Sequence, residues 1–300
     1  MHILKTITHE TIWGGNRLEA CSEAKSNKIG HLYSLISNEE FESEIINGEY
    51  KGLKLKEYFE KNKSAFHLDC YKKFPFTIAL TDATDSLSLQ VHPNDKVAKE
   101  TLNMPYGKNE SWYFIEPPES GKIYNGCRAK STDELRQKVD KRYYDGIIDY
   151  LDVEKDDYVY VKAGTLHALS AGSLVYEIEE NCNVTYRLYD FDRTDDNSNK
   201  RLLQTEDAIK ATDVNLKSKA EKYNGEKIER IYSTQLFKNK TEYTNNSNTI
   251  ECLTIIKGFS KIEKYEIRTG MTIILEPKET VKLSVSNFII SRPIIKEGSK

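Results

Sequence analysis

The stretch from 87 to 95 constrains the fold of this chain more than any other part of the sequence. Its two kinds of residue alternate: Leu87, Leu89 and Val91 are apolar, and Ser88, Gln90 and His92 are polar. This period of two predicts an extended strand whose polar side chains share one face. Gln90 and His92 then lie about 7 Å apart at the backbone, so both side chains can converge on a single ion. Pro93 ends the predicted strand.

Short β-rich segments, separated by turns, lie before and after this strand in the sequence. They cover 74–81, 111–115, 158–161 and 174–178, with glycine turns at Gly164 and Gly172. Short strands at close spacing are typical of a β-barrel or a β-sandwich. Two helices are expected elsewhere, at 53–62 and 205–211, where the apolar residues have helical spacing. The polar run 192–200 predicts a loop.

A charged segment interrupts this pattern of strands. Ser131 and Glu134 form a capping box, in which Ser131 begins a helix and Glu134 follows three residues later. Apolar residues at helical spacing continue to Leu151. We therefore expect a small helical insert over 131–151.

A second group of apolar segments follows a hydrophilic connection at 220–227. These segments cover 249–256, 261–267, 271–275, 281–285 and 288–290. The stretches 156–164 and 269–277 share a turn, an apolar run and a second turn, as two cupin-like jelly rolls would. We predict a mainly β protein of two cupin-like jelly-roll barrels, with a metal-binding domain at 1–218 and a domain without a metal site at 219–300. No histidine occurs after His167, so a histidine-built site belongs to the first domain.

Composition excludes several classes of partner and location. The net charge is −3 and there is no long run of Lys or Arg, so neither nucleic acid nor an anionic membrane is expected as a partner. We find neither a signal-peptide apolar region at the start nor about 18 consecutive apolar residues elsewhere, which predicts a cytoplasmic protein. The five cysteines lie far apart and are expected to be reduced. A monomer or a homodimer is expected.

Four polar residues of the predicted strands form a candidate metal site. His92 and His167 each lie beside a sharp turn, and Gln90 and Glu110 accompany them. Two imidazoles and two oxygen ligands suit Zn²⁺, Mn²⁺ or Fe²⁺, and the absence of a thiolate favours a catalytic site over a structural one. Chance placement of polar residues on strands is the alternative. The other four of the six histidines are expected to be surface or packing residues: His2, His9, His31 and His67.

A second polar cluster lies downstream, between 177 and 193. Arg187 and Arg193 can bind an oxyanion or a phosphate through planar donors, and Glu177 can move a proton. Ion pairing at the surface is the alternative interpretation of these residues. A metal site and an anion site in one domain together favour an enzyme.

Five blocks of this sequence resemble the signature blocks of type I mannose-6-phosphate isomerases in their short bacterial form. They are QVHPND at 90–95, GKNESWY at 107–113, AGTLHA at 163–168, TYRLYD at 185–190 and WGGNRL at 13–18. The blocks occur in the family's order across roughly the first two thirds of the chain.

This resemblance implies a zinc-dependent cupin enzyme that interconverts mannose 6-phosphate and fructose 6-phosphate through a cis-enediol(ate). One Zn²⁺ per chain is implied, with other divalent metals as alternatives, and the small-molecule partner is a sugar phosphate. The implied metal ligands are Gln90, His92, Glu110 and His167. The implied catalytic residues are Arg187, Glu177 and Lys108, and the implied substrate-binding residues are Ser88 and Arg193.

Two departures from the family pattern keep other functions open. Ala79 stands where the family usually has a lysine, and HLYS at 31–34 replaces an expected Glu-Ser-Trp-Glu block. A metal-cupin paralogue that binds a sugar or sugar phosphate with little or no isomerase activity is therefore the second hypothesis. A cupin dioxygenase is the third, and the match of the ligand set and the arginine to an isomerase disfavours it.

Overall fold

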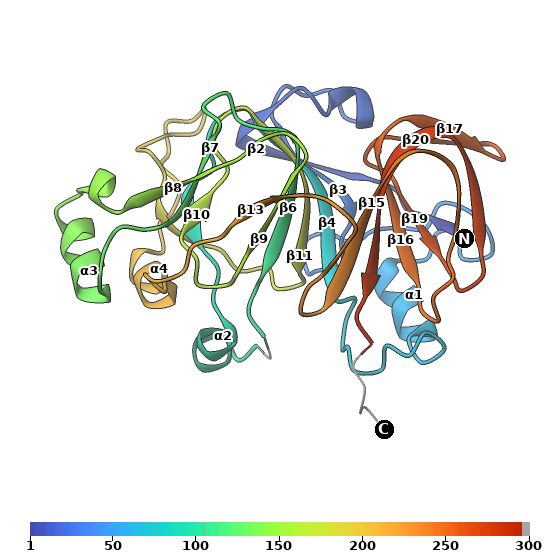
Figure 1. The fold of residues 1–300 in the computed structure, drawn as a ribbon, viewed down its shortest axis with the longest axis horizontal. Helices are drawn as coiled ribbons and strands as arrows, with labels where there is room; N and C mark the ends of the chain where they lie inside the picture. Colours follow the sequence, from blue (N-terminus) through green and yellow to red (C-terminus); the bar gives the residue numbers. More distant parts are fainter. Residues whose placement is uncertain (105, 296–300) are drawn as a thin grey trace.

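The structure, a computed structural model, describes residues 1–104 and 106–295. Antiparallel sheets dominate it, which confirms the predicted mainly β fold (Figure 1). We call the seven-stranded and five-stranded sheets the first β unit, and the six-stranded and two-stranded sheets the second β unit.

The two sheets of the first β unit supply every strand that carries a predicted site residue. The seven-stranded sheet has the order β13 (Ala220–Lys222), β9 (Asp157–Val161), β6 (Glu110–Glu116), β11 (Ser173–Glu180), β4 (Phe76–Ala83), β3 (Ile29–Leu35) and β2 (Ile7–Gly15). The five-stranded sheet has the order β12 (Tyr186–Tyr189), β5 (Leu89–Val91), β10 (His167–Ala168), β7 (Lys122–Cys127) and β8 (Ile148–Asp152).

The second β unit contains the C-terminal strands and the first strand of the chain. Its six-stranded sheet has the order β1 (His2–Ile3), β19 (Thr272–Leu275), β16 (Glu251–Lys257), β20 (Thr280–Pro293), β15 (Tyr232–Thr244) and β14 (Glu226–Ile228). The two-stranded sheet pairs β17 (Phe259–Ile262) with β18 (Tyr265–Arg268).

The described residues form four α-helices outside the sheets: α1 (Leu55–Asn62), α2 (Asp95–Leu102), α3 (Thr132–Asp140) and α4 (Thr205–Ala211). Helices α1 and α4 confirm the two helices predicted from apolar spacing. Helix α2 was not predicted; it begins where the side chain of Asn94 accepts a hydrogen bond from the backbone N–H of Val97 at 3.0 Å. None of the described helices is long and apolar enough to cross a membrane.

The two faces of β5 have different neighbours. Leu89 and Val91 pack in one cluster with the apolar faces of α3 and α4, so Gln90 between them points to the opposite face. Leu87 departs from the prediction, because it lies before the strand and packs in another cluster with Trp13 and Trp112. The alternation therefore holds over β5 itself and not over the whole of 87–92.

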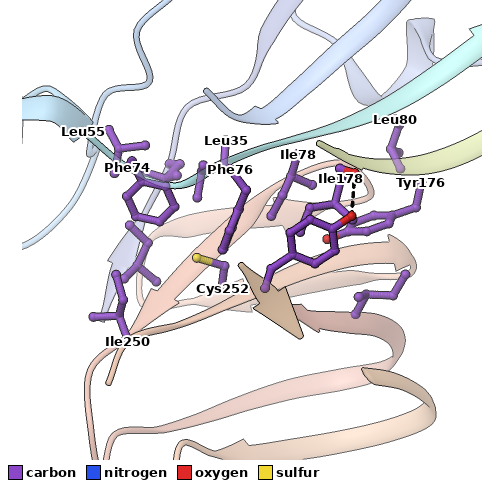
Figure 2. Close-up of a cluster of buried hydrophobic side chains, with 14 of the residues drawn as sticks. Leu35, Leu55, Phe74, Phe76, Ile78, Leu80, Tyr176, Ile178, Ile250 and Cys252 are labelled. Carbon is purple, nitrogen blue, oxygen red and sulfur yellow. Dashed lines mark hydrogen bonds between the residues drawn. The ribbon is translucent and has the colours of Figure 1, made fainter. Parts of the chain in front are cut away.

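A buried cluster joins the two β units. Figure 2 shows side chains of β4 and β11, such as Phe76 and Ile178, facing residues of the second β unit, such as Ile250 and Cys252. Each fully buried side chain of this size contributes about 1.5–3 kcal/mol by leaving water. The Tyr176 hydroxyl also lies 2.7 Å from the Ser291 hydroxyl across the contact.

The helical insert predicted over 131–151 is shorter than expected. Its start is confirmed, since Ser131 caps α3 by accepting a hydrogen bond from the backbone N–H of Glu134 at 3.1 Å. The helix ends at Asp140 because Arg142 adopts a left-handed φ of 54°. The backbone N–H of the following residue, Tyr143, then donates a hydrogen bond to the carbonyl oxygen of Lys138. The rest of the predicted insert contains a 3₁₀ turn and the strand β8.

Other boundaries also differ from the expected ones. The 13-residue strand β15 was missed, because its outer half is polar and exposed and has no alternating pattern. The strands expected at 281–285 and 288–290 form the single strand β20. The division into 1–218 and 219–300 stays a prediction; β13 pairs with β9 of the first β unit, and β1 pairs with β19 of the second.

We predict that Phe76→Ala destabilises the whole chain. Phe76 is fully buried between the β units and contacts the rings of Phe74 and Tyr232, so its loss leaves a cavity. The free energy of unfolding in urea should fall by about 3–5 kcal/mol. Val285→Ala, at an exposed position of β20, is the control. A loss below about 1 kcal/mol for Phe76→Ala would contradict the role of this contact.

Candidate metal centre and cavity

Three neighbouring strands of the five-stranded sheet place three predicted site residues in a row. Gln90 on β5 lies opposite His167 on β10 and opposite Arg187 on β12. Directly opposed residues of antiparallel strands point to the same face of a sheet. The fold therefore brings Gln90, His167 and Arg187 together from positions up to 97 residues apart in the chain.

Glu110 meets this row from the other sheet of the first β unit. Its two carboxylate oxygens each lie 3.1 Å from one imidazole, Oε2 from His92 Nε2 and Oε1 from His167 Nε2. All three residues are buried, at about 1% exposure. Together they form a group whose ligand atoms all lie within 4.8 Å of one another.

Hydrogen bonds on the far side of each ring define the tautomers of the two histidines. His92 Nδ1 lies 2.9 Å from the carbonyl oxygen of Val184, and His167 Nδ1 lies 2.8 Å from that of Thr165. A carbonyl oxygen can only accept, so each Nδ1 carries the proton and each Nε2 has a free lone pair. Burial and the charge of Lys108 lower the pKa of His92 to about 4, which keeps its ring neutral near pH 7.

The convergent atoms at this centre are therefore all acceptors. Within residues 1–104 and 106–295, no hydrogen-bond donor serves His92 Nε2, His167 Nε2 or Glu110 Oε1. Buried acceptors that face one another without a donor are unfavourable unless a cation lies between them. Two imidazoles, each oriented by a backbone carbonyl, and one carboxylate are a donor set that fits a divalent metal ion.

A cavity of about 400 Å³ opens beside these acceptors. It is lined by six of the residues singled out from the sequence: Ser88, Gln90, Lys108, Glu110, Glu177 and Arg187. The Ser88 hydroxyl donates a hydrogen bond to Gln90 Oε1 at 3.2 Å. Gln90 is thus held on the cavity wall beside His167, where it can act as a fourth ligand.

A second carboxylate, Glu177 on β11, is fixed in the wall by two donors. Trp112 Nε1 donates to Oε1 at 3.0 Å, and the Thr81 hydroxyl donates to Oε2 at 2.6 Å. Burial and the negative charges of Glu110 and Glu179 raise the pKa of Glu177 to about 7. A carboxyl group with such a pKa can both accept and return a proton near neutral pH.

Lys108 supplies a buried positive charge next to these carboxylates. Its Nζ forms an ion pair with Glu179 and lies 3.9 Å from Glu110 Oε2. Burial acts against the charged form, but Glu179, Glu110 and Glu177 raise the pKa of Lys108 above its usual value. The ammonium group therefore stays protonated and can donate to an oxygen in the cavity.

The two predicted arginines have different environments. Arg187 lines the cavity, and its buried Nε has no hydrogen-bond partner in the described part of the chain. Arg193 lies outside the cavity lining, where it bonds to Asp190 and to the carbonyl oxygen of Ser86. Arg201, which the sequence analysis did not single out, lines the cavity beside Arg187 and also pairs with Asp190.

His9 and His31 pack against aromatic side chains, as expected, and both also line the cavity, which was not predicted. His31 Nδ1 lies 3.0 Å from the Thr81 hydroxyl. That hydroxyl donates its only proton to Glu177, so His31 must donate to Thr81. The alternation of His31, buried Leu32 and Tyr33 along β3 could have revealed this, since it places His31 and Tyr33 on one face.

Comparisons with known proteins identify the family of this chain. Residues 1–118 match the phosphomannose isomerase type I catalytic domain. The mannose-6-phosphate isomerase of Streptococcus mutans is 36% identical over 208 residues, which cover 69% of this chain and 66% of that protein. The mannose-6-phosphate isomerase ManA of Bacillus subtilis is 32% identical over 233 residues, which cover 77% of this chain and 74% of that protein. The chain belongs to the type I phosphomannose isomerase family.

The phosphomannose isomerase fold extends over both β units. A crystal structure of the mannose 6-phosphate isomerase from Bacillus subtilis matches 97% of this chain and 99% of its own, with a TM-score of 0.84 and 29% identity. The resemblance found in the sequence is therefore confirmed at the level of the family, and it includes the C-terminal strands that carry no signature block.

We predict that His167→Ala removes the metal ion from the purified protein. The substitution deletes one of two imidazole ligands and leaves Glu110 facing an empty space. Metal content by mass spectrometry should fall from about one ion per chain toward none. His67→Ala, at an exposed position far from the cavity lining, should keep its metal. Equal metal content in both variants would contradict the assignment of the centre.

Proposed function

We propose that this member of the phosphomannose isomerase family is a metal-dependent aldose-ketose isomerase that interconverts mannose 6-phosphate and fructose 6-phosphate. The observation that carries the proposal is the convergence of three buried acceptors, from His92, Glu110 and His167, next to a cavity that Glu110 and Glu177 both line. Membership of the family supports the same reaction.

The metal ion would be held by His92, Glu110 and His167, with Gln90 as the fourth ligand. Nitrogen and oxygen donors without a thiolate suit Zn²⁺, and Mn²⁺ or Fe²⁺ can use the same set. When bound, the ion supplies a Lewis acid that stabilises negative charge on oxygens of the sugar. The Nδ1 hydrogen bonds of both histidines keep their Nε2 atoms aimed at this position.

Glu177 is the group that moves the proton in our proposal. It removes the proton from C2 of the open-chain aldose; the C–H electron pair forms the C1–C2 double bond of a cis-enediol(ate), and the carbonyl electron pair moves onto O1. The O2 hydroxyl proton then passes to O1, the C2 carbonyl forms, and the carboxyl group returns its proton to C1, which gives the ketose and restores the carboxylate. Trp112 and Thr81 hold the two oxygens in place during both transfers. Lys108 donates a hydrogen bond to a sugar oxygen whose charge increases along the path.

The phosphate would lie at the arginine end of the cavity. Arg187 lines this end, its Nε has no hydrogen-bond partner among the described residues, and the planar guanidinium group suits a phosphate. We assign the second cation to Arg201 in place of Arg193, because Arg201 lines the cavity and Arg193 does not. Ser88 lines the cavity together with Leu87 and Gln90, and it would contact the sugar.

Ala79 in the cavity wall supports a second candidate function. This residue lines the cavity and brings no charge to a position where the family usually has a lysine. Fewer positive charges weaken the attraction for a phosphorylated sugar. A protein that binds a sugar or sugar phosphate with little turnover is therefore the alternative to the isomerase.

The same proposal includes the setting in which the chain acts. Its partner is a small sugar phosphate, which is a cytoplasmic metabolite, and the five cysteines are free, as a reducing compartment requires. A monomer or a homodimer stays a prediction.

A coupled assay across three sugars tests the proposed function. We expect fructose 6-phosphate to form from mannose 6-phosphate, with no turnover of glucose 6-phosphate or unphosphorylated mannose. A chelator should abolish the reaction and added Zn²⁺ should restore it. Full activity in metal-free protein would contradict the metal-dependent mechanism, and saturable sugar binding without product would favour the second candidate.

We predict that Glu177→Gln lowers kcat about 100-fold to 10,000-fold, because the amide keeps the shape of the side chain and cannot accept the proton. Metal content should be unchanged, since Glu177 is not among the proposed ligands. Glu40→Gln, at the exposed rim of the same cavity, is the matched control and should retain its kcat. A normal kcat for Glu177→Gln would assign the proton transfer to another group.

A further inference from the structure

Arg230 connects the second β unit to the segments that carry the metal ligands. It lies between β14 and β15, and its side chain reaches back to the first β unit. The guanidinium group forms a two-pronged contact with Glu180: Nε donates to Oε1 at 2.7 Å, and Nη2 donates to Oε2. The remaining arm, Nη1, donates to Asp95. One side chain thus binds two carboxylates from different parts of the chain.

The contact with Glu180 leads to Glu110. Glu180 is the last residue of β11 and is buried at 1% exposure. Its carboxylate accepts a hydrogen bond from the backbone N–H of Asn109 at 3.3 Å, and its own N–H donates to the Asn109 carbonyl at 2.9 Å. Asn109 directly precedes Glu110. The position of the Glu180 side chain therefore affects the backbone that presents the carboxylate ligand.

The contact with Asp95 leads to His92 in the same way. Asp95 lies three residues after His92 and accepts a hydrogen bond from the backbone N–H of Gly107 at 2.8 Å. The N–H of Lys108 donates to the carbonyl oxygen of Pro93 at 3.1 Å. A side chain at Gly107 would place its Cβ 2.0 Å from that carbonyl oxygen, so only glycine permits this approach. The segments 92–95 and 107–110 are thus bound together.

We infer that Arg230 is a positioning residue for the metal centre, through which the second β unit holds the His92 and Glu110 segments at the spacing that the ion requires. This inference rests on the proposed function, since it assumes that the centre binds a metal. It also gives the second β unit, which lacks histidine ligands, a role in the site.

Physical chemistry supports this role for an arginine in particular. A planar guanidinium group with five donors can form a fork to one carboxylate and still bind a second one, whereas a lysine ammonium acts as a point charge. Without the arginine, the buried carboxylate of Glu180 would lose its cation, which is costly in a dry environment. Glu180 would then shift toward water and change the backbone at Asn109. Residues behind the ligands commonly change metal affinity about 10-fold to 100-fold.

Zinc affinity of the full-length chain tests the inference without relying on turnover. Competition with a chromophoric chelator measures the Kd, and the visible spectrum of the Co²⁺-loaded protein reports the geometry of the ligands. We expect Arg230→Gln to weaken Zn²⁺ binding roughly 10-fold or more and to change the Co²⁺ spectrum. Arg230→Lys should restore part of the affinity, because it keeps the charge and loses the fork.

A matched control exists in the same sheet. Arg292 is as exposed as Arg230, at 32% and 33% of the side chain, and it also pairs with a glutamate, Glu226 at 2.6 Å. Arg292→Gln should leave the Kd and the Co²⁺ spectrum unchanged. An equal effect in both arginine variants would overturn the inference, because it would show a general loss of stability.

A milder variant decides the question if Arg230→Gln does not fold. Asp95→Asn removes the ion pair at a half-exposed carboxylate and keeps an acceptor for the Gly107 N–H. We expect weaker Zn²⁺ binding in the folded protein. Wild-type affinity for both Arg230→Gln and Asp95→Asn, or for Asp95→Asn alone if only that variant folds, would overturn the inference. A wild-type chain that binds no Zn²⁺ would overturn both this inference and the proposed function.

Discussion

The rest of the structure depends on one contact, in which the lone pairs of two imidazoles face the same carboxylate. His92 and His167 each turn a free Nε2 toward Glu110 at 3.1 Å, and all three side chains are about 1% exposed. Such a group of acceptors destabilises a fold unless a cation binds them. The backbone carbonyls that fix both rings, and the ion pairs that hold the neighbouring segments, maintain this arrangement. The cavity and the proposed proton transfer are built around it.

Three strands of the first β unit, β5, β6 and β11, contribute different residues to this centre and the cavity beside it. β5 turns Leu89 and Val91 toward the helices and Gln90 toward the cavity. β6 and β11 bring in Glu110 and Glu177 from the opposite sheet. The second β unit adds no ligand, but it buries the outer face of β4 and β11 and supplies Arg230. A unit that supplies no proposed metal ligand can therefore still support the metal centre.

The sequence indicated the residues of the candidate metal centre but not much of the cavity wall. Gln90, His92, Glu110 and His167 stood out because alternation and turns are local signals, and the structure brings the last three within 4.8 Å of one another. Arg201 was missed because it lies in a loop between β12 and α4, where the sequence has no strand pattern. His31 was missed although the alternation along β3 places it on one face with Tyr33. Arg193 is a cation of the right type that lies outside the cavity lining. The strand β15 and the end of α3 were missed for local reasons, a polar exposed strand and a left-handed residue at Arg142.

Anomalous X-ray diffraction at the zinc edge, from crystals of the zinc-loaded chain, tests the central claim most directly. We expect one strong peak per chain, within coordination distance of the Nε2 atoms of His92 and His167 and of the Glu110 carboxylate, about 2.0–2.2 Å from each. A zinc-loaded crystal with no peak at this position, or with the two Nε2 atoms turned away from Glu110, would contradict it.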